Sequence, residues 1–469
     1  MSLSASIAKN TFIHTFGKFF ASGIGLVIVA LLTRYLGAAG FGYYTTIFSY
    51  LFFFATAGDL GLYLITVNEL GRHPENKEHI YSHLFSLRLI SGLFFMLLAD
   101  IIIWFFPYEP MIKIGTIIIS VCVFAMMLDQ LSVALFQEQM KTKFIAMAEI
   151  IGKTLTLILV YIFIRLNLGL LAMLVATTIG LLVHTVFNLY FARKMLAFKF
   201  AYHKETWKKI LKESWPIATY LVFSMIYFKA DTIILSLYYP AKVVGFYGAP
   251  YKILEVLITM PAIFMGLVTP HLSRSWAEKN FHHFKEIFQK AFDFLSFIVW
   301  PMIFGVLVLA KPIMNFIAGP EFIPSASIFK ILIVATGVIF MAHLTTFSIV
   351  AINKQKSMMK FYILAAIVAL TLYFIFIPKY SYFAAAIITV GVESFILICS
   401  WILTKKETGI KINFINSFKA LLASLVMTLA LLLTNFDLLG SIILAIVVYG
   451  LGTWLLGLLR KKAFALLQK

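Results

Sequence analysis

The chain has 469 residues, of which 62% are hydrophobic, and it carries a formal net charge of +19 at pH 7. A soluble domain is usually about 45–50% apolar, so this chain has more apolar surface than one globular core could bury. The composition therefore excludes a soluble globular protein and predicts an integral membrane protein, with lipid as the solvent for much of its surface.

Fourteen apolar segments are long enough to cross a bilayer. Each is expected to be a helix, because in hydrocarbon only helices and closed barrels satisfy their own backbone hydrogen bonds. The runs are also too long for the short alternating strands of a barrel. In chain order, the predicted helices are 11–33, 42–67, 84–106, 112–137, 144–164, 169–192, 215–238, 245–270, 287–309, 325–350, 358–377, 383–404, 416–434 and 438–459.

Lysines and arginines are distributed unevenly among the connections between these segments. Most of the 39 lie in alternate connections, above all in the basic stretch 193–214, and few lie in the others. Because this bias sets the orientation of membrane helices, both termini are predicted to be cytoplasmic, with the chain in the cytoplasmic (inner) cell membrane. Topology thus explains the positive charge, and nucleic acid is not expected as a partner.

A short internal repeat divides the chain. Gly42-Tyr43-Tyr44 joins the first two segments and Gly245-Phe246-Tyr247 joins the seventh and eighth, at an offset of 203 residues that also relates Lys9 to Lys212. Two similar six-helix bundles in parallel orientation are therefore expected. The predicted domains are an N-terminal lobe (1–192), a cytoplasmic linker (193–214), a C-terminal lobe (215–404), and two further helices with a basic cytoplasmic tail (405–469).

Charged residues within the apolar segments are the candidate functional residues, because an ionisable group in a bilayer is costly and normally faces the bundle interior. Four of the cations have no acidic residue at helical spacing, and we expect them to be water-exposed and to await an anion. Lys330 is one of them but is not among the candidate substrate-binding residues, whereas the other three are; these are Lys18, Arg88 and Lys229. Two more, Lys153 and Lys252, have Glu149 and Glu255 at helical spacing, and a local ion pair with that neighbour is the alternative explanation for each. Together these five cations are the predicted substrate-binding residues.

Three carboxylates are candidates for coupling transport to H⁺ or Na⁺: Asp59, Asp231 and Glu393. A hydrogen bond between packed helices explains Asp59 or Glu393 nearly as well, and Asp231 could instead be a solvated residue near the membrane surface. The sequence shows no catalytic signature, P-loop or metal-ligand spacing. We therefore predict a transporter rather than an enzyme, with no cofactor or bound metal beyond the coupling ion.

Several short motifs resemble those of a known transporter family. They are Leu31 through Tyr44, Gly58 through Leu62, Asp231 through Leu235, Val244 through Tyr247, and Pro270 through Ser273. These stretches resemble lipid-linked oligosaccharide flippases, which form the polysaccharide transporter branch of the multidrug/oligosaccharidyl-lipid/polysaccharide exporter superfamily. The resemblance covers the whole chain in helix number and layout.

The resemblance implies two pseudosymmetric lobes around a central cavity that faces each side of the membrane in turn. It implies a polyprenyl-pyrophosphate-linked glycan as substrate, with a glycan polymerase or glycosyltransferases of the same pathway as partners. The buried cations fit such a substrate, because a pyrophosphate offers charge-assisted hydrogen bonds. An ion-coupled multidrug/cation antiporter of the same fold is the alternative. A glycan polymerase or a channel is disfavoured by the short outer connections and by the lack of a pore-loop pattern.

Overall fold

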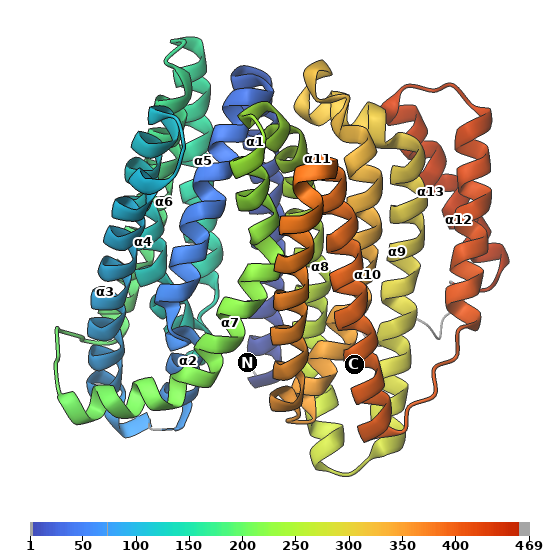
Figure 1. Ribbon diagram of the computed structural model, residues 1–469. Helices are drawn as coiled ribbons and strands as arrows, with labels where there is room; N and C mark the ends of the chain where they lie inside the picture. The colour runs from blue at the N-terminus through green and yellow to red at the C-terminus, as the bar shows by residue number, and fades with distance from the viewer. Residues whose placement is uncertain (1–2, 73, 459–469) are drawn as a thin grey trace. The chain divides into compact units, whose positions relative to one another are not determined.

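The computed structural model describes residues 3–72 and 74–458, and helices dominate this part of the chain (Figure 1). No strand occurs among these residues, so the predicted all-helical fold is confirmed for them. The basic tail predicted beyond residue 458 lies outside the described residues. The chain divides into two compact units, Met1–Gly248 and Ala249–Lys469, and each unit is described by itself.

The first unit contains seven helices and the start of an eighth. They are α1 (Leu3–Asp59), α2 (Leu62–Arg72), α3 (Lys77–Ile102), α4 (Pro110–Glu138), α5 (Lys143–Arg165), α6 (Gly169–Met195), α7 (Lys204–Tyr238) and α8 (Ala241–Ala277), with short 3₁₀ turns at Pro74–Asn76 and Ile103–Phe105. Part of the predicted linker is therefore helical, because residues 204–214 form the first turns of α7.

Up to residue 458, where the described part of the chain ends, the second unit holds the rest of α8 and five further helices. They are α9 (Phe281–Ala318), α10 (Ser325–Ala351), α11 (Gln355–Thr408), α12 (Ile415–Leu433) and α13 (Leu438–Leu455), with a 3₁₀ turn at Pro320–Phe322. The last two helices pack on α9, where Tyr449 donates a 2.6 Å hydrogen bond to the carbonyl of Phe297. Met427 and Leu309 lie in the same apolar cluster. Helices α12 and α13 are thus integral to this unit.

Within the described residues, twelve helical stretches are long and apolar enough to cross a membrane. Two of them are too long for one crossing, at 56 residues for Gly17–Arg72 and 54 for Gln355–Thr408, because about 20 helical residues span the hydrocarbon core. Each has a backbone break, at Gly37 (φ 65°) and at Ser381 (φ 54°). Both breaks fall where the sequence predicts a turn, and dividing the two helices there recovers the predicted fourteen segments.

Helices α1 and α8 approach each other closely within the first unit. A Cβ on Gly42 would lie 1.7 Å from the carbonyl oxygen of Ala241, and a Cβ on Gly245 would lie 1.9 Å from that of Ala38. Only glycine allows backbones this close. The repeat offset relates Ala38 to Ala241 and Gly42 to Gly245, so the contact is reciprocal, as expected for elements related by a pseudo-two-fold axis.

The core of the first unit lies between α1, α3, α4 and α6. Ile47, Leu51, Ile119 and Leu174 are fully buried there. Helix α5 packs against both α1 and α6, while α7 packs against α1. Charged residues on α1, α3, α4 and α5 are therefore held by a rigid helical scaffold.

Candidate functional site

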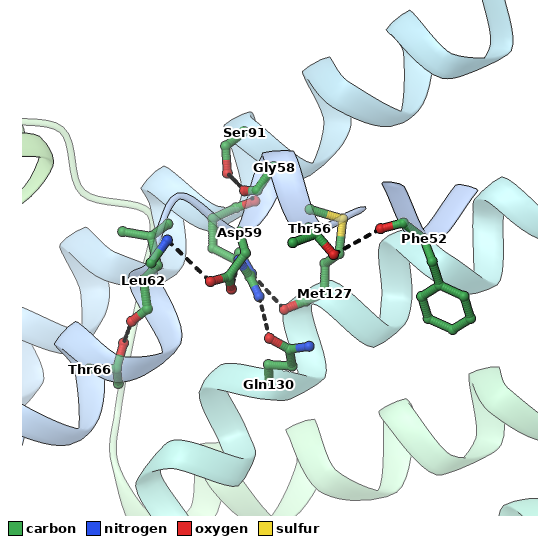
Figure 2. Close-up of polar contacts among 11 residues, drawn as sticks. Phe52, Thr56, Gly58, Asp59, Leu62, Thr66, Ser91, Met127 and Gln130 are labelled. Atoms are coloured by element: carbon green, nitrogen blue, oxygen red, sulfur yellow. Dashed lines mark hydrogen bonds and ion pairs between the residues drawn. The ribbon is translucent and has the colours of Figure 1, made fainter. Parts of the chain in front are cut away.

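Arg88 of α3 is fully buried, and its guanidinium is enclosed by partners from two other helices. Nη1 forms an ion pair with Asp59 at the end of α1. Nε donates to the carbonyl of Met127 and Nη2 donates to Oε1 of Gln130, both at 2.7 Å. Figure 2 shows Asp59 facing these two residues of α4. The prediction that Arg88 is unpaired and water-exposed is therefore wrong.

The position of Asp59 follows from a break in the chain between α1 and α2. Leu60 and Gly61 both have positive φ, at 50° and 73°. The backbone N–H of Gly61 donates to Oδ2 of Asp59 at 3.1 Å, so the carboxylate also holds the turn. Nearby, Ser91 of α3 donates to the carbonyl of Gly58 at 3.0 Å. Asp59 and Arg88 therefore fasten the end of α1 to α3 and α4.

The two lysines with local acidic neighbours form the predicted ion pairs. In the first unit, Lys153 lies 2.9 Å from Glu149, with side chains 32% and 23% exposed. In the second unit, Lys252 lies 2.8 Å from Glu255, with side chains 24% and 25% exposed. Both pairs keep their charges partly accessible, which distinguishes them from the pair of Arg88.

Lys18 and Lys153 are presented near one another by the packing of α1 on α5. A Cβ on Gly17 would lie 2.6 Å from Cβ of Ala146, so the two helices touch there. A Cβ on Gly25 would lie 3.6 Å from Nζ of Lys153. Gly25 follows Lys18 by two helical turns on the same face, about 10 Å along the axis. Lys18 is half-buried and, within the described part of the chain, has no ion pair.

Lys229 of α7 is only 7% exposed, so the expectation that it is water-exposed is wrong. Its Nζ lies 5.4 Å from the ring centre of Phe228, and its charge acts on Asp231. Asp231 is 1% exposed and accepts hydrogen bonds from the hydroxyl of Tyr247 and from the backbone of Thr232. The solvated alternative for Asp231 is therefore also wrong.

Glu393 of α11 is 6% exposed in the second unit. It has no hydrogen-bond partner among the residues that the structure describes. Of the three candidate coupling acids, Asp59 and Asp231 are buried with partners, and Glu393 is buried without one. The structure thus places two of the predicted cations beside predicted acids, Arg88 with Asp59 and Lys229 with Asp231.

A cavity of about 500 Å³ opens beside the first turns of α7 in the first unit. Glu69 of α2, His79 of α3, and Lys209 and Glu213 of α7 contribute its polar lining. None of the predicted substrate-binding or coupling residues lines it. Figure 1 shows these first turns of α7 lying crosswise near the ends of α2 and α3.

Comparison with known proteins places this arrangement in a family. The family described as "Polysaccharide biosynthesis protein" matches residues 7–276, and the family described as "Lipid II flippase MurJ" matches residues 165–457. A Shigella flexneri protein named "Putative O-antigen transporter" is 24% identical over 418 residues, covering 85% of this chain and 98% of that protein.

Solved structures share the fold across most of the chain. The lipid II flippase MurJ in an inward closed conformation superposes with a TM-score of 0.81 at 17% identity, covering 96% of this chain and 100% of that one. An inward-facing multidrug MATE transporter superposes with a TM-score of 0.68 at 14% identity, covering 85% and 98%. The chain therefore belongs to the lipid-linked oligosaccharide flippases, in the polysaccharide transporter branch of the multidrug/oligosaccharidyl-lipid/polysaccharide exporter superfamily.

Proposed function

We propose that this protein moves a polyprenyl-pyrophosphate-linked oligosaccharide from the cytoplasmic to the outer leaflet by alternating access, for the synthesis of a cell-surface polysaccharide. The observation that carries the proposal is a set of partly accessible lysines within apolar helices: Lys18, Lys153 and Lys252. The ammonium groups of these lysines would bind the phosphates and acidic sugars of the substrate, while its polyprenyl tail stays in lipid. Membership in a flippase family supports this assignment.

The geometry of the lysine pairs suits a substrate that binds and then leaves. Each of Lys153 and Lys252 has one partner, a carboxylate from the same helix, and both partners are partly exposed. A partly exposed pair of this kind contributes only about 0–1 kcal/mol. A phosphate oxygen can therefore replace the carboxylate with little loss, because it offers charge-assisted hydrogen bonds of the same kind.

Arg88 acts differently in this proposal. Its three nitrogens already engage Asp59, Met127 and Gln130, and the side chain is fully buried. An incoming phosphate would have to break several bonds and enter a closed space. We therefore assign Arg88, with Asp59, to holding the end of α1 in place, and assign phosphate binding to the lysines.

The multidrug antiporter alternative has weaker support. The superposition on the MATE transporter is poorer than that on the lipid II flippase, with TM-scores of 0.68 and 0.81. Two of the acids predicted to attract a cationic drug, Asp59 and Asp231, are also buried and occupied by partners. Glu393 remains the proposed candidate for binding a coupling ion, because among the three predicted acids it is the one that has no partner in the described part of the chain.

Transport by the purified protein tests the function. Proteoliposomes would carry undecaprenyl pyrophosphate joined to a fluorescent oligosaccharide, and an impermeant quencher would report how much label reaches the other leaflet. We expect Lys153→Gln and Lys252→Gln to slow flipping at least tenfold. Lys311→Gln is the matched control, because Lys311 is an exposed lysine near the end of α9 that is not a candidate for substrate binding. Failure to move this lipid, together with ion-driven movement of a cationic dye, would favour the antiporter.

Orientation is a separate part of the proposal. From the distribution of lysine and arginine we infer that both termini lie in the cytoplasm and that the protein lies in the inner membrane. Reporter fusions after residues 110, 240, 320 and 380 should read external, and fusions after residues 140, 200, 280 and 355 should read internal. Inverted readings at two neighbouring positions would contradict this topology. Glycosyltransferases that build the lipid-linked glycan on the cytoplasmic side, and a polymerase outside, are the partners that this orientation requires.

A further inference from the structure

A second polar cluster lies between α4 and α6 in the first unit, apart from the residues assigned above. Oδ2 of Asp129 lies 3.6 Å from Nε2 of His184. The same ring nitrogen lies 3.2 Å from Nδ2 of Asn188, one turn further along α6. The side chains of Asp129 and His184 are 6% and 17% exposed, and Asn188 is fully buried. The cluster is therefore enclosed by protein.

Several polar atoms of this cluster are buried and have no hydrogen-bond partner in the described part of the chain. Oδ1 of Asp129 and Oδ1 of Asn188 are buried without a hydrogen-bond partner among the described residues. The neighbouring hydroxyls of Ser132 and Thr185, on the same helices, are also buried without one. A buried acceptor left unpaired is strongly unfavourable, and most buried polar atoms in proteins have a partner. The two hydroxyls can donate to these oxygens, but an ionised Asp129 would remain a buried charge, with His184 as the ionisable side chain at ion-pair distance. A buried carboxylate is costly unless it is protonated or paired with a positive charge.

Counting hydrogens identifies that charge. If the amide of Asn188 donates to Nε2 of His184, the imidazole faces Asp129 with a lone pair, and carboxylate and imidazole repel each other unless Asp129 is protonated. If the imidazole instead carries hydrogen on Nε2 and on Nδ1, it is a cation paired with Asp129. In these two arrangements the pair holds one dissociable proton. In a third, a neutral imidazole donates from Nε2 to the ionised carboxylate and that proton has been released, so the two side chains titrate as a unit.

We propose that Asp129 and His184 form a proton-binding site in the first unit, and that this proton is taken up and released during transport. Its exchange during transport rests on the proposed flippase function. The site differs from the coupling acids predicted from the sequence, which are Asp59, Asp231 and Glu393. Histidine suits this role, because its ordinary pKa lies within the physiological range.

Helix α5 connects the proton site to a lysine of the proposed substrate site. A Cβ on Gly152 would lie 2.8 Å from Cβ of His184, so α5 and α6 are in direct contact there. Glu149 lies three positions before Gly152 and Lys153 directly follows it, and the charges of both act on the imidazole. Together with Tyr81 of α3, these are the ionisable groups that face the pair.

The contact through α5 predicts whether proton binding and phosphate binding favour or oppose each other. A phosphate bound to Lys153 would neutralise its charge and release Glu149, which makes the surroundings of His184 more negative. Proton binding and phosphate binding should then favour each other, and the coupling must be reciprocal. Loss of the proton would in turn weaken the hold of Lys153 on the substrate.

Infrared difference spectroscopy of the full-length protein in lipid nanodiscs tests the site without any substrate. Spectra recorded between about pH 8 and about pH 5 should show bands of an imidazole and a buried carboxyl group changing together. Asp129→Asn should remove this coupled signal and lower proton uptake by one per protein. Asp100→Asn is the matched control, because Asp100 is a half-buried acid of the same unit that accepts from Ser120. This control should retain the signal.

If Asp129→Asn does not fold, Asn188→Leu provides the second test. It keeps both titrating groups but removes the amide, so the coupled signal should persist at a shifted midpoint. A signal that survives Asp129→Asn, a midpoint that Asn188→Leu leaves unchanged, or a response to Na⁺ rather than pH would overturn the proposal.

Flipping assays then separate the proton site from the proposed function. In the quenching assay, the dependence of the rate on pH should be lost in Asp129→Asn and retained in Asp100→Asn. If the wild-type protein binds the proton but moves no lipid-linked glycan, the flippase assignment fails and the proton site stands. If it moves the glycan with equal pH dependence in both variants, the proton site fails and the flippase assignment stands.

Discussion

Two ion pairs in the first unit have the same charges but different surroundings. Arg88 and Asp59 come from different helices, their side chains are 0% and 9% exposed, and α4 supplies two more hydrogen-bond acceptors. Lys153 and Glu149 come from one helix, their side chains are 32% and 23% exposed, and each has the other as its ion-pair partner. Both pairs lie in helices that are otherwise apolar.

The difference shows that charge within an apolar helix does not by itself mark a substrate site. A buried pair joins helices and is costly to break, because removing one partner leaves the other charged and unsolvated. A partly exposed pair is weak, and its partners can be exchanged. The first kind of pair fixes the scaffold, and the second kind can bind and release an anion.

The largest predicted effect follows from breaking the buried pair. Asp59→Asn or Arg88→Met should each lower the free energy of unfolding by about 3–5 kcal/mol, because each leaves an uncompensated charge or an unpaired polar group. The double variant Asp59→Leu with Arg88→Met should recover much of this loss, since it removes both charges. Unfolding of the purified protein in detergent, followed by tryptophan fluorescence, measures all three.

The partly exposed pair of Lys153 and Glu149 is the control for these three variants. The corresponding neutral substitutions in that pair should change the free energy of unfolding little. If Arg88→Met unfolds at the same denaturant concentration as the wild type, the pair does not hold α1 in place. Arg88 would then return to the set of substrate-binding cations that the sequence predicts.

The sequence alone predicts the helices and the local pairs for a simple reason. A run of about 20 apolar residues and a lysine one turn from a glutamate are both visible along the chain. Even the breaks at Gly37 and Ser381 fall between predicted segments. These features depend only on neighbouring residues, and the structure confirms them.

Contacts between helices are not visible in the same way. Asp59 lies 29 positions before Arg88, and Asp129 lies 55 before His184, so no helical spacing relates the members of either pair. The sequence therefore shows no partner for Arg88, and it does not relate His184 to Asp129. The stripe of His184 and Asn188, four positions apart on α6, was the one local signal that could have indicated the second site.

Exchanging the two charges of the partly exposed pair tests how it differs from the buried pair of Arg88 and Asp59. Lys153→Glu combined with Glu149→Lys keeps both charges one turn apart, so stability should change by less than about 1 kcal/mol. Flipping should nevertheless fall severalfold, because the cation moves by a helical turn relative to its place beside Gly25 of α1. The same exchange at Asp59 and Arg88 should instead abolish folding, since the buried hydrogen bonds of the guanidinium cannot be re-formed.

Thermal unfolding and the quenching assay, run on the same preparations, measure the two effects. Normal flipping by the exchanged variant would mean that Lys153 contributes only net charge, without binding phosphate at a defined position. Loss of folded protein would mean that the exposed pair is structural after all.

The smallest effect on stability is expected at Lys18, which has no ion pair in the described part of the chain and is half-buried on α1. Lys18→Gln removes no partner and leaves no buried charge, so unfolding should shift by no more than about 0.5 kcal/mol. Flipping should still fall. Lys18 lies two helical turns from the ammonium group of Lys153, and both lysines would contact the pyrophosphate of one substrate molecule. Lys18→Arg keeps the charge and should retain most of the activity, although a guanidinium differs from an ammonium in geometry. If Lys18→Gln flips the substrate as fast as the wild type, the anion site is confined to the paired lysines. If the Gln and Arg variants lose the same amount of flipping activity, Lys18 acts through its packing rather than its charge.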